Sequence, residues 1–121
     1  MKKKIMVVDD EEDIVELTKT IFEMDGYKVL TASSGKECLE KLEKQKVDVV
    51  VLDIMMPFMS GWDVAAKIKG SPKWNDIPII FLTAKGDMMS KGVGALAADK
   101  YIVKPFDKKT LLDSVAEVLK R

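Results

Sequence analysis

Short runs rich in β-branched and aromatic residues alternate along the whole chain with longer segments of helical periodicity. The expected strands are Lys4 to Val8, Tyr27 to Thr31, Val47 to Leu52, Pro78 to Leu82 and Tyr101 to Val103. Strands joined through helices pair in parallel, with right-handed crossovers that place helices on both faces of the sheet. The alternation therefore predicts an α/β fold with a doubly wound, five-stranded parallel sheet.

Four of the connecting segments carry apolar stripes at helical spacing, which we interpret as core. Ser34, with Glu37 three positions later, has the capping-box pattern, and Asp107 precedes the last helix. The segment Asp87 to Ala98 contains two glycines that each cost a helix interior about 1 kcal/mol, and we predict a fourth helix there. The stripe residues are Ile14, Leu17, Thr18, Ile21, Cys38, Leu39, Leu42, Val64, Ala65, Ile68, Leu111, Leu112, Val115, Val118 and Leu119.

The composition suits one domain over residues 1–121, because 47% of the 121 residues are hydrophobic and 33% are charged. The 20 acidic and 20 basic residues cancel, so no overall field favours nucleic acid or an anionic membrane. The first apolar run is too short for a signal peptide, and no later stretch approaches the length of a membrane span. We therefore expect a cytoplasmic protein without direct nucleic-acid or membrane binding.

The chain contains no histidine, which excludes serine and cysteine triads, histidine general bases and most zinc sites. Its single cysteine, Cys38, cannot form an internal disulfide and is interpreted as a small residue on a helix. Neither residue type therefore offers a catalytic or metal-binding centre.

Polar residues stand at the carboxyl ends of four expected strands. One of them interrupts the apolar run "VVVLDIMMP", where an aspartate would cost several kcal/mol if it were buried without a partner. Open parallel sheets bind ligands just beyond the carboxyl ends of their strands, so these residues should lie along one edge. The four polar endings are Asp9-Asp10, Asp53, Thr83-Ala84 and Lys104-Pro105.

The chemistry of this edge fits a phosphoryl group beside a metal ion. The carboxylates of Asp9, Asp10 and Asp53 would repel one another unless a cation stood among them, and Mg²⁺ prefers such oxygen ligands. Lys104 adds a positive charge and Thr83 a hydroxyl group. A carboxylate in such a site can be the nucleophile that forms an aspartyl phosphate. A single strand-end aspartate is more often a turn former, but four such endings together favour a functional site.

At these residues the sequence resembles the receiver domains of response regulators, the phosphoacceptor half of two-component signalling. The resemblance covers the whole chain and implies a flavodoxin-like (βα)5 three-layer sandwich with strand order 2-1-3-4-5. It is carried by five motifs in order, which are "VVDDEED", "VVLDIMMP", "GWDV", "IPIIFLTAK" and "YIVKPF".

The resemblance implies that Asp53 accepts phosphate from a phosphohistidine on a sensor histidine kinase or phosphotransfer protein. The protein would not be an enzyme beyond self-catalysed phosphorylation and slow loss of that phosphate. Asp10, Asp53 and the Met55 carbonyl would bind Mg²⁺ directly, with Asp9 holding it through water. Mn²⁺ could take the same place.

The resemblance also implies that the Thr83 hydroxyl, the Ala84 amide and Lys104 bind the phosphoryl oxygens, with a cis bond before Pro105 aiming the lysine. Thr83 and Tyr101 would be the switch residues that remodel the face made by residues 87–98, the fifth strand and the last helix. A strand tyrosine is as often a half-buried packing residue, so both interpretations of Tyr101 stay open.

In this family the lifetime of the phosphate is tuned by the residues two beyond the phosphoacceptor and two beyond the hydroxyl residue, which are Met55 and Lys85 here. Neither side chain activates water well, so we expect slow hydrolysis. The unmodified protein should be a monomer, with dimerisation possible on phosphorylation. The output partner is not predicted.

Several departures from the family pattern, among them a slightly short span from Thr83 to Tyr101, fall on the signalling face and leave the phosphorylation site untouched. Phe58 stands where a glycine usually follows the "MP", so the turn must avoid positive φ or carry strain. "ALAADKY" lacks a common glycine and has Lys100 in place of a frequent acid.

Three alternative functions share some features with this sequence. A phosphatase of the haloacid-dehalogenase kind would need an aspartate where Met55 stands, and the chain has no room for a cap domain. A nucleotide-binding module would need a glycine-rich loop in place of "DDEED". A receiver-like scaffold that never takes phosphate keeps the fold, although the intact site residues argue against it.

Overall fold

The computed structural model describes residues 2–84 and 99–120 and shows one parallel sheet in the order β2-β1-β3-β4-β5. All four neighbouring pairs run parallel. This confirms the predicted fold class and strand order. The strands are β1 (Lys4–Val8), β2 (Lys28–Ala32), β3 (Val49–Asp53), β4 (Ile79–Ala84) and β5 (Lys100–Lys104).

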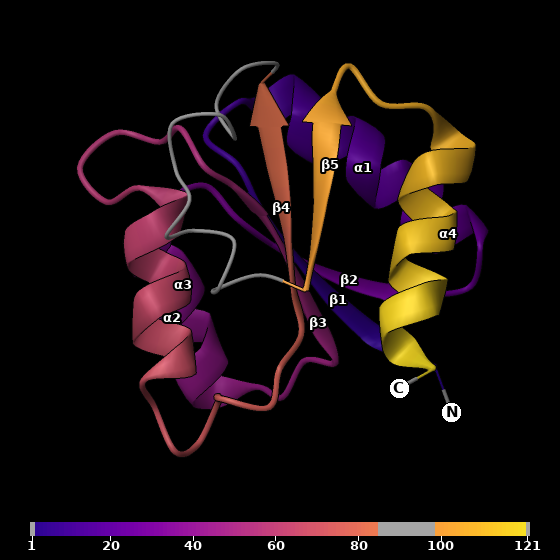
Figure 1. Cartoon of the computed structure of the whole chain (residues 1–121). Coiled ribbons are helices and arrows are strands. Elements are labelled where there is room, and N and C mark those ends of the chain that lie inside the picture. Colours follow the sequence, from indigo (N-terminus) through magenta and orange to yellow (C-terminus); the bar gives the residue numbers. More distant parts are fainter. Residues whose placement is uncertain (1, 85–98, 121) are drawn as a thin grey trace.

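Helices cover both faces of the sheet, as Figure 1 shows, with α2 and α3 on one side and α1 and α4 on the other. None of the helices in the described ranges is long and apolar enough to cross a membrane. The helix expected over 87–98 lies outside the described residues. The described helices are α1 (Glu12–Met24), α2 (Gly35–Lys44), α3 (Gly61–Lys69) and α4 (Lys108–Leu119).

The strands supply two cores because successive side chains point to opposite faces. On β1, Met6 and Val8 pack beneath α2 and α3, whereas Ile5 and Val7 pack toward α1 and α4. All four side chains are fully buried, and each such burial stabilises the fold by roughly 1.5–3 kcal/mol. This explains why the inner strands read as continuous apolar runs rather than alternating ones.

The apolar stripe predicted on α1 included one residue that is not buried. Leu17 is 50% exposed, and the buried face of the helix consists of Val15, Thr18 and Phe22. Thr18 is accommodated there because its hydroxyl donates to the Ile14 carbonyl at 2.5 Å. The other predicted stripes do face the two cores, and Cys38 is a buried free cysteine on α2 as expected.

Side-chain caps begin three of the helices. The Ser34 hydroxyl accepts from the Glu37 amide at 3.1 Å, but the Glu37 carboxylate turns to the Ser33 amide rather than to that of Ser34. The reciprocal capping box is instead at Ser60 and Asp63, at the start of α3. Its S-x-x-D spacing was visible in the sequence and was missed. Asp107 caps α4, as predicted.

The turn after β3 carries backbone strain. Phe58 has φ of 69°, a left-handed conformation in which a side chain crowds the backbone. Its side chain is also fully exposed to solvent. The sequence left two possibilities for this turn, a backbone that avoids positive φ or a strained one. The structure shows the strained one.

We expect Phe58→Gly to raise the free energy of unfolding by about 1 kcal/mol, because relief of the left-handed strain outweighs the extra freedom of glycine in the unfolded chain. Urea unfolding followed by circular dichroism measures the difference. Phe58→Ala is the matched control, since alanine removes the ring and keeps the strain. A glycine variant no more stable than the alanine variant would contradict this prediction.

Candidate functional site

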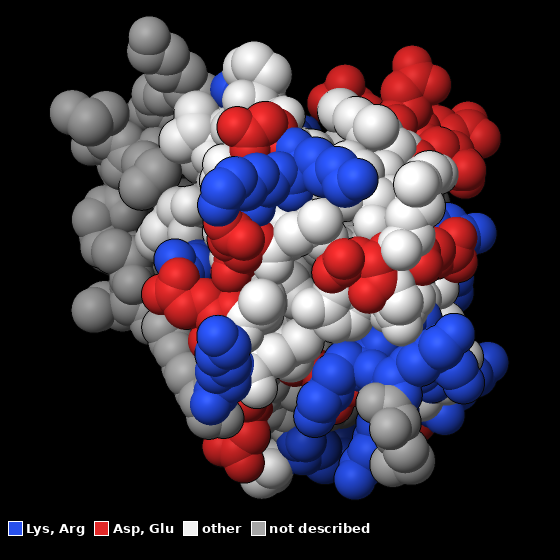
Figure 2. Space-filling model, turned by 90° about the vertical axis from the view of Figure 1, so that its right-hand side faces the viewer, with Lys and Arg blue, Asp and Glu red and all other residues white. Residues whose placement is uncertain are grey.

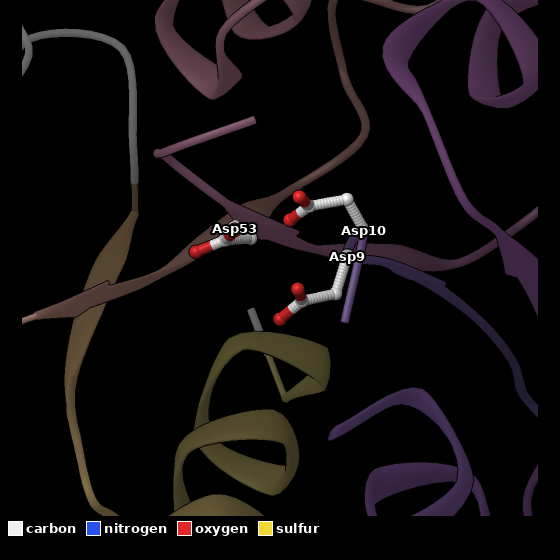
Figure 3. A group of neighbouring side chains, drawn as sticks. All are labelled: Asp9, Asp10 and Asp53. Atoms are coloured by element: carbon white, nitrogen blue, oxygen red, sulfur yellow. The ribbon is translucent and has the colours of Figure 1, made fainter. Parts of the chain in front are cut away.

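The carboxyl ends of the strands bring three aspartates together. Asp9 follows β1 and is fully buried, Asp53 ends β3 and is 4% exposed, and Asp10 is exposed. One carboxylate oxygen of each lies within 4.8 Å of those of the other two. Figure 3 shows the three side chains grouped at the ends of β1 and β3. The edge predicted from the strand endings therefore exists, with its acids in one cluster.

Lys104, the last residue of β5, lies between two of these acids. Its Nζ donates to Asp9 Oδ2 at 3.0 Å and to Asp53 Oδ1 at 3.1 Å. Glu11 Oε1 lies 3.7 Å from the same Nζ. Glu11 was not among the predicted site residues. The amide of Glu11 also donates to Asp9 Oδ1 at 2.9 Å, so Asp9 is held at both oxygens.

One ammonium group is shared by two buried carboxylates, and it does not offset the cost of burying them. Burial raises the pKa of Asp53 to about 6, and the nearby charge of Asp9 adds to the rise against the opposing effect of Lys104. Burial also raises the pKa of Asp9, although the Glu11 amide and Lys104 oppose it. For Lys104 burial alone would lower the pKa, but its bond to Asp9 and the Asp53 charge raise it overall.

The last two residues of β4, Thr83 and Ala84, lie at the same edge of the sheet. Thr83 is fully buried, and its hydroxyl donates to the neighbouring Ala84 carbonyl at 3.2 Å. Ala84 ends the strand opposite Lys104 of β5. Met55 lies beyond β3 with a side chain that is 66% exposed. Lys85 lies outside the described residues.

The start of α3 is packed directly against the end of β3. A Cβ added to Gly61 would lie 2.3 Å from the Asp53 carbonyl oxygen, so no other residue fits without displacing that backbone. The Gly61 amide donates to the Ile54 carbonyl at 2.8 Å. Gly61 therefore positions Asp53, a role that the sequence analysis missed although the glycine directly after Ser60 was a visible signal.

Tyr101 lies in an aromatic cluster beside β4. Its ring centroid is 5.5 Å from that of Phe81 and 6.5 Å from that of Trp62, and Trp62 also packs on Phe81 at 4.7 Å. The Tyr101 hydroxyl is buried and has no hydrogen-bond partner among the described residues. The ring thus does pack as expected of a strand tyrosine, while its proposed role as a switch stays a prediction.

The donor set fits a hard divalent cation. Three carboxylates and one ammonium leave an excess of negative charge, and the oxygens of Asp9, Asp10 and Asp53 converge from two strand ends. Oxygen-only sets of this kind suit Mg²⁺, which keeps several waters and leaves room for phosphate oxygens. Burial is the main cause of the raised pKa of Asp53, and the charge of Asp9 adds to it, which is consistent with this excess of negative charge.

Comparison with known proteins decides the family. Residues 5–116 match the response regulator receiver domain. The chain belongs to this family. As a receiver domain it is the phosphoacceptor signalling part of a two-component system, and the phosphatase and nucleotide-binding alternatives are set aside.

Curated relatives of this receiver domain are regulators of about twice its length. The probable transcriptional regulator ycf27 of Guillardia theta is 45% identical over 121 residues, covering 99% of this chain and 46% of that protein. The alkaline phosphatase synthesis transcriptional regulatory protein PhoP of Bacillus subtilis is 43% identical, covering 100% of this chain and 50% of that protein. The receiver domain thus spans about half the length of these relatives.

Solved structures agree with the fold of this receiver domain over nearly its whole length. A putative response regulator from Chloroflexus aurantiacus superimposes with a TM-score of 0.94 at 30% identity, covering 100% of both chains. The response regulator TrrA from Thermotoga maritima, solved in complex with Mg²⁺-BeF, has a TM-score of 0.86 at 40% identity and covers 96% of this chain and 98% of that one.

Proposed function

We propose that this receiver domain accepts a phosphoryl group on Asp53 in the cytoplasm, from a phosphohistidine of a sensor histidine kinase or phosphotransfer protein. The observation that carries the proposal is the position of Asp53, which ends a central strand within 3.1 Å of Lys104 and beside two further carboxylates. A carboxylate oxygen forms the new bond to phosphorus as the bond from phosphorus to the histidine nitrogen breaks. That nitrogen keeps the electron pair and takes up a proton.

Asp10, Asp53 and the Met55 carbonyl would hold Mg²⁺ or Mn²⁺ directly, and Asp9 would hold it through water. When bound, the ion neutralises charge on the phosphoryl oxygens. Lys104 is already at the site, and it would turn from Asp9 toward the phosphoryl group together with the Thr83 hydroxyl and the Ala84 amide. The transfer is self-catalysed in this proposal, because all of these groups belong to the receiver domain itself.

Incubation with Mg²⁺ and acetyl phosphate, followed by intact-protein mass spectrometry and peptide mapping, tests the proposal. We expect one added phosphate, located on Asp53. Protein that gains no phosphate under these conditions would favour the alternative of a receiver-like scaffold that is never phosphorylated.

We expect Mg²⁺ to raise the melting temperature of the wild type but not of Asp10→Ala, because Asp10 supplies one of the few protein oxygens that hold the ion. A thermal-shift series over Mg²⁺ concentration measures this. Asp13→Ala is the matched control, since Asp13 is an exposed acid on α1 outside the cluster. Equal shifts in wild type and Asp10→Ala would place the metal elsewhere.

We expect the phosphate on Asp53 to last minutes or longer and to be lost several-fold faster in Met55→Asn. A thioether does not orient the in-line water needed for hydrolysis, whereas an amide can. Decay is followed by mass after removal of the donor, with Met24→Asn as the control for an exposed methionine remote from the site. Lys85 is proposed as the second residue that tunes lifetime. Decay of the wild type within seconds would refute this role for Met55.

The signal would leave through the face made by residues 87–98, β5 and α4, with Thr83 and Tyr101 as switch residues. The protein is proposed to be a monomer that can dimerise through this face on phosphorylation. Size-exclusion chromatography with and without beryllofluoride and Mg²⁺ tests this. An elution volume that stays constant would exclude dimerisation as the output.

A further inference from the structure

Phe58 combines two unfavourable features in one residue. Its backbone is in the left-handed region, with φ of 69°, which is a genuine outlier for a bulky residue. Its side chain has a relative exposure of 108%, the highest among the large exposed hydrophobic residues of the described chain. A glycine would remove both costs. A strained, exposed aromatic residue therefore calls for a functional reason.

The fold itself supplies no such reason. Phe58 is absent from both core clusters and from the aromatic pairs among the described residues. The turn is held by backbone contacts, with the Met59 amide donating to the Pro57 carbonyl at 2.8 Å and the Gly61 amide to the Ile54 carbonyl. Removal of the ring would therefore leave these bonds in place.

The location of Phe58 points to a partner that approaches Asp53. The residue lies in the loop that joins the phosphoacceptor strand β3 to α3, and Figure 1 shows this loop projecting beside the upper ends of the strands. The same loop exposes Met55 by 66%. Asp53 is 4% exposed, so a protein that brings a phosphohistidine within bonding distance must cover the surrounding loops. A small phosphodonor can reach Asp53 without covering these loops.

We propose that Phe58 is the apolar anchor by which this domain docks the protein that delivers its phosphoryl group. The partner would present an apolar pocket beside its phosphohistidine, into which the Phe58 ring inserts. Exposed aromatic residues that become buried in such pockets commonly dominate binding, while their neighbours contribute little. This inference rests on the proposed phosphorylation of Asp53 and specifies how the protein donor is recognised.

The charges around the site predict which charge the partner carries around its apolar pocket. A hollow of about 310 Å³ next to Asp9 and Asp10 is lined by three further acids, Glu12, Glu16 and Glu37. Figure 2 shows one group of acidic side chains at the upper right of this face, with lysines both beside it and at the lower right. A donor with basic residues around its apolar pocket would match this surface and be steered toward it.

The test compares two phosphodonors on the same variants. The protein donor is the autophosphorylated core of the histidine kinase that, in a panel of such cores, phosphorylates the wild-type chain fastest. The small donor is acetyl phosphate. Wild type, Phe58→Ala, Phe58→Gly and the control Met24→Ala are compared by initial rates of phosphorylation. Met24 is exposed by 75% at the far end of α1, so it matches the loss of an exposed apolar side chain.

We expect both Phe58 variants to slow transfer from the kinase about tenfold or more, with rates from acetyl phosphate within about twofold of wild type. Phe58→Gly is the sharper variant, because it should be more stable than wild type and still a poorer acceptor from the kinase. Met24→Ala should behave as wild type with both donors.

Three outcomes would overturn the inference. Kinase transfer could be unchanged in both Phe58 variants, or both donors could be slowed equally, which would mean that Phe58 shapes the Asp53 site itself. The third is that no kinase core phosphorylates wild type faster than acetyl phosphate does. Failure of the underlying function has a separate signature, which is the absence of any phosphate on Asp53 from acetyl phosphate.

Discussion

Asp53→Asn is expected to abolish phosphorylation and also to make the protein more stable at pH 7. The amide keeps the shape of the side chain but provides no anionic nucleophile. The stability gain follows from burial, which raises the pKa of Asp53 from 3.8 to about 6 with a further contribution from Asp9. Because this pKa is higher in the folded state than in the unfolded chain, ionising Asp53 opposes folding.

The sign of the pH dependence follows from these two pKa values. The favourable contribution of protonated Asp53 is complete below about pH 4 and is lost as pH rises through about 6. Above that, the ionised group costs on the order of 3 kcal/mol, at 1.36 kcal/mol per pKa unit. Asparagine does not ionise, so Asp53→Asn should gain up to about this amount at pH 7 and little near pH 4.

Urea unfolding at pH 7 and pH 4.5, together with mass spectrometry after incubation with acetyl phosphate, measures both effects. Asp76→Asn is the matched control, because Asp76 is an exposed aspartate remote from the cluster. Phosphate uptake by Asp53→Asn would refute Asp53 as the acceptor. Stability equal to wild type at pH 7 would show that the buried carboxylate is not under electrostatic strain.

Lys104→Met is expected to destabilise the protein by about 3–5 kcal/mol at pH 7, because it leaves two buried carboxylates without a counter-charge. Lys104 now contacts Asp9 at 3.0 Å and Asp53 at 3.1 Å. Phosphorylation from acetyl phosphate should fall by about 10²–10³-fold, the usual effect of removing one group that stabilises a developing negative charge. Methionine fills similar volume, so loss of charge dominates both effects.

Acid and Mg²⁺ should each restore much of the stability of Lys104→Met. Burial and the charge of Asp9 raise the pKa of Asp53 to about 6, so lowering the pH toward 5 protonates Asp53 and removes its repulsion of Asp9. Urea unfolding at pH 7 and pH 5, with and without Mg²⁺, measures this. Lys109→Met is the control, because Lys109 pairs with Asp113 at an exposed helix surface and its loss should have little effect. A pH-independent loss of stability in Lys104→Met would contradict the electrostatic explanation.

Local sequence information predicted the fold class and the location of the site. The alternation of strands and helices was sufficient for a parallel sheet with helices on both faces, whereas the strand order came from the resemblance to receiver domains. Asp9, Asp53 and Lys104 could be placed at one edge because the carboxyl ends of parallel strands always meet there. The same local rules failed at Leu17, since the exact face that α1 turns to the sheet depends on neighbouring elements.

The tertiary structure alone decided how these residues interact. The pairing of Lys104 with Asp9 joins residues that are 95 positions apart, and the raised pKa of Asp53 depends on burial by the whole domain. The left-handed backbone of Phe58 is likewise imposed by the turn between β3 and α3, against the preference of the residue. Sequence patterns report local preference and periodicity, whereas distances, burial and charge balance arise only when distant segments pack together.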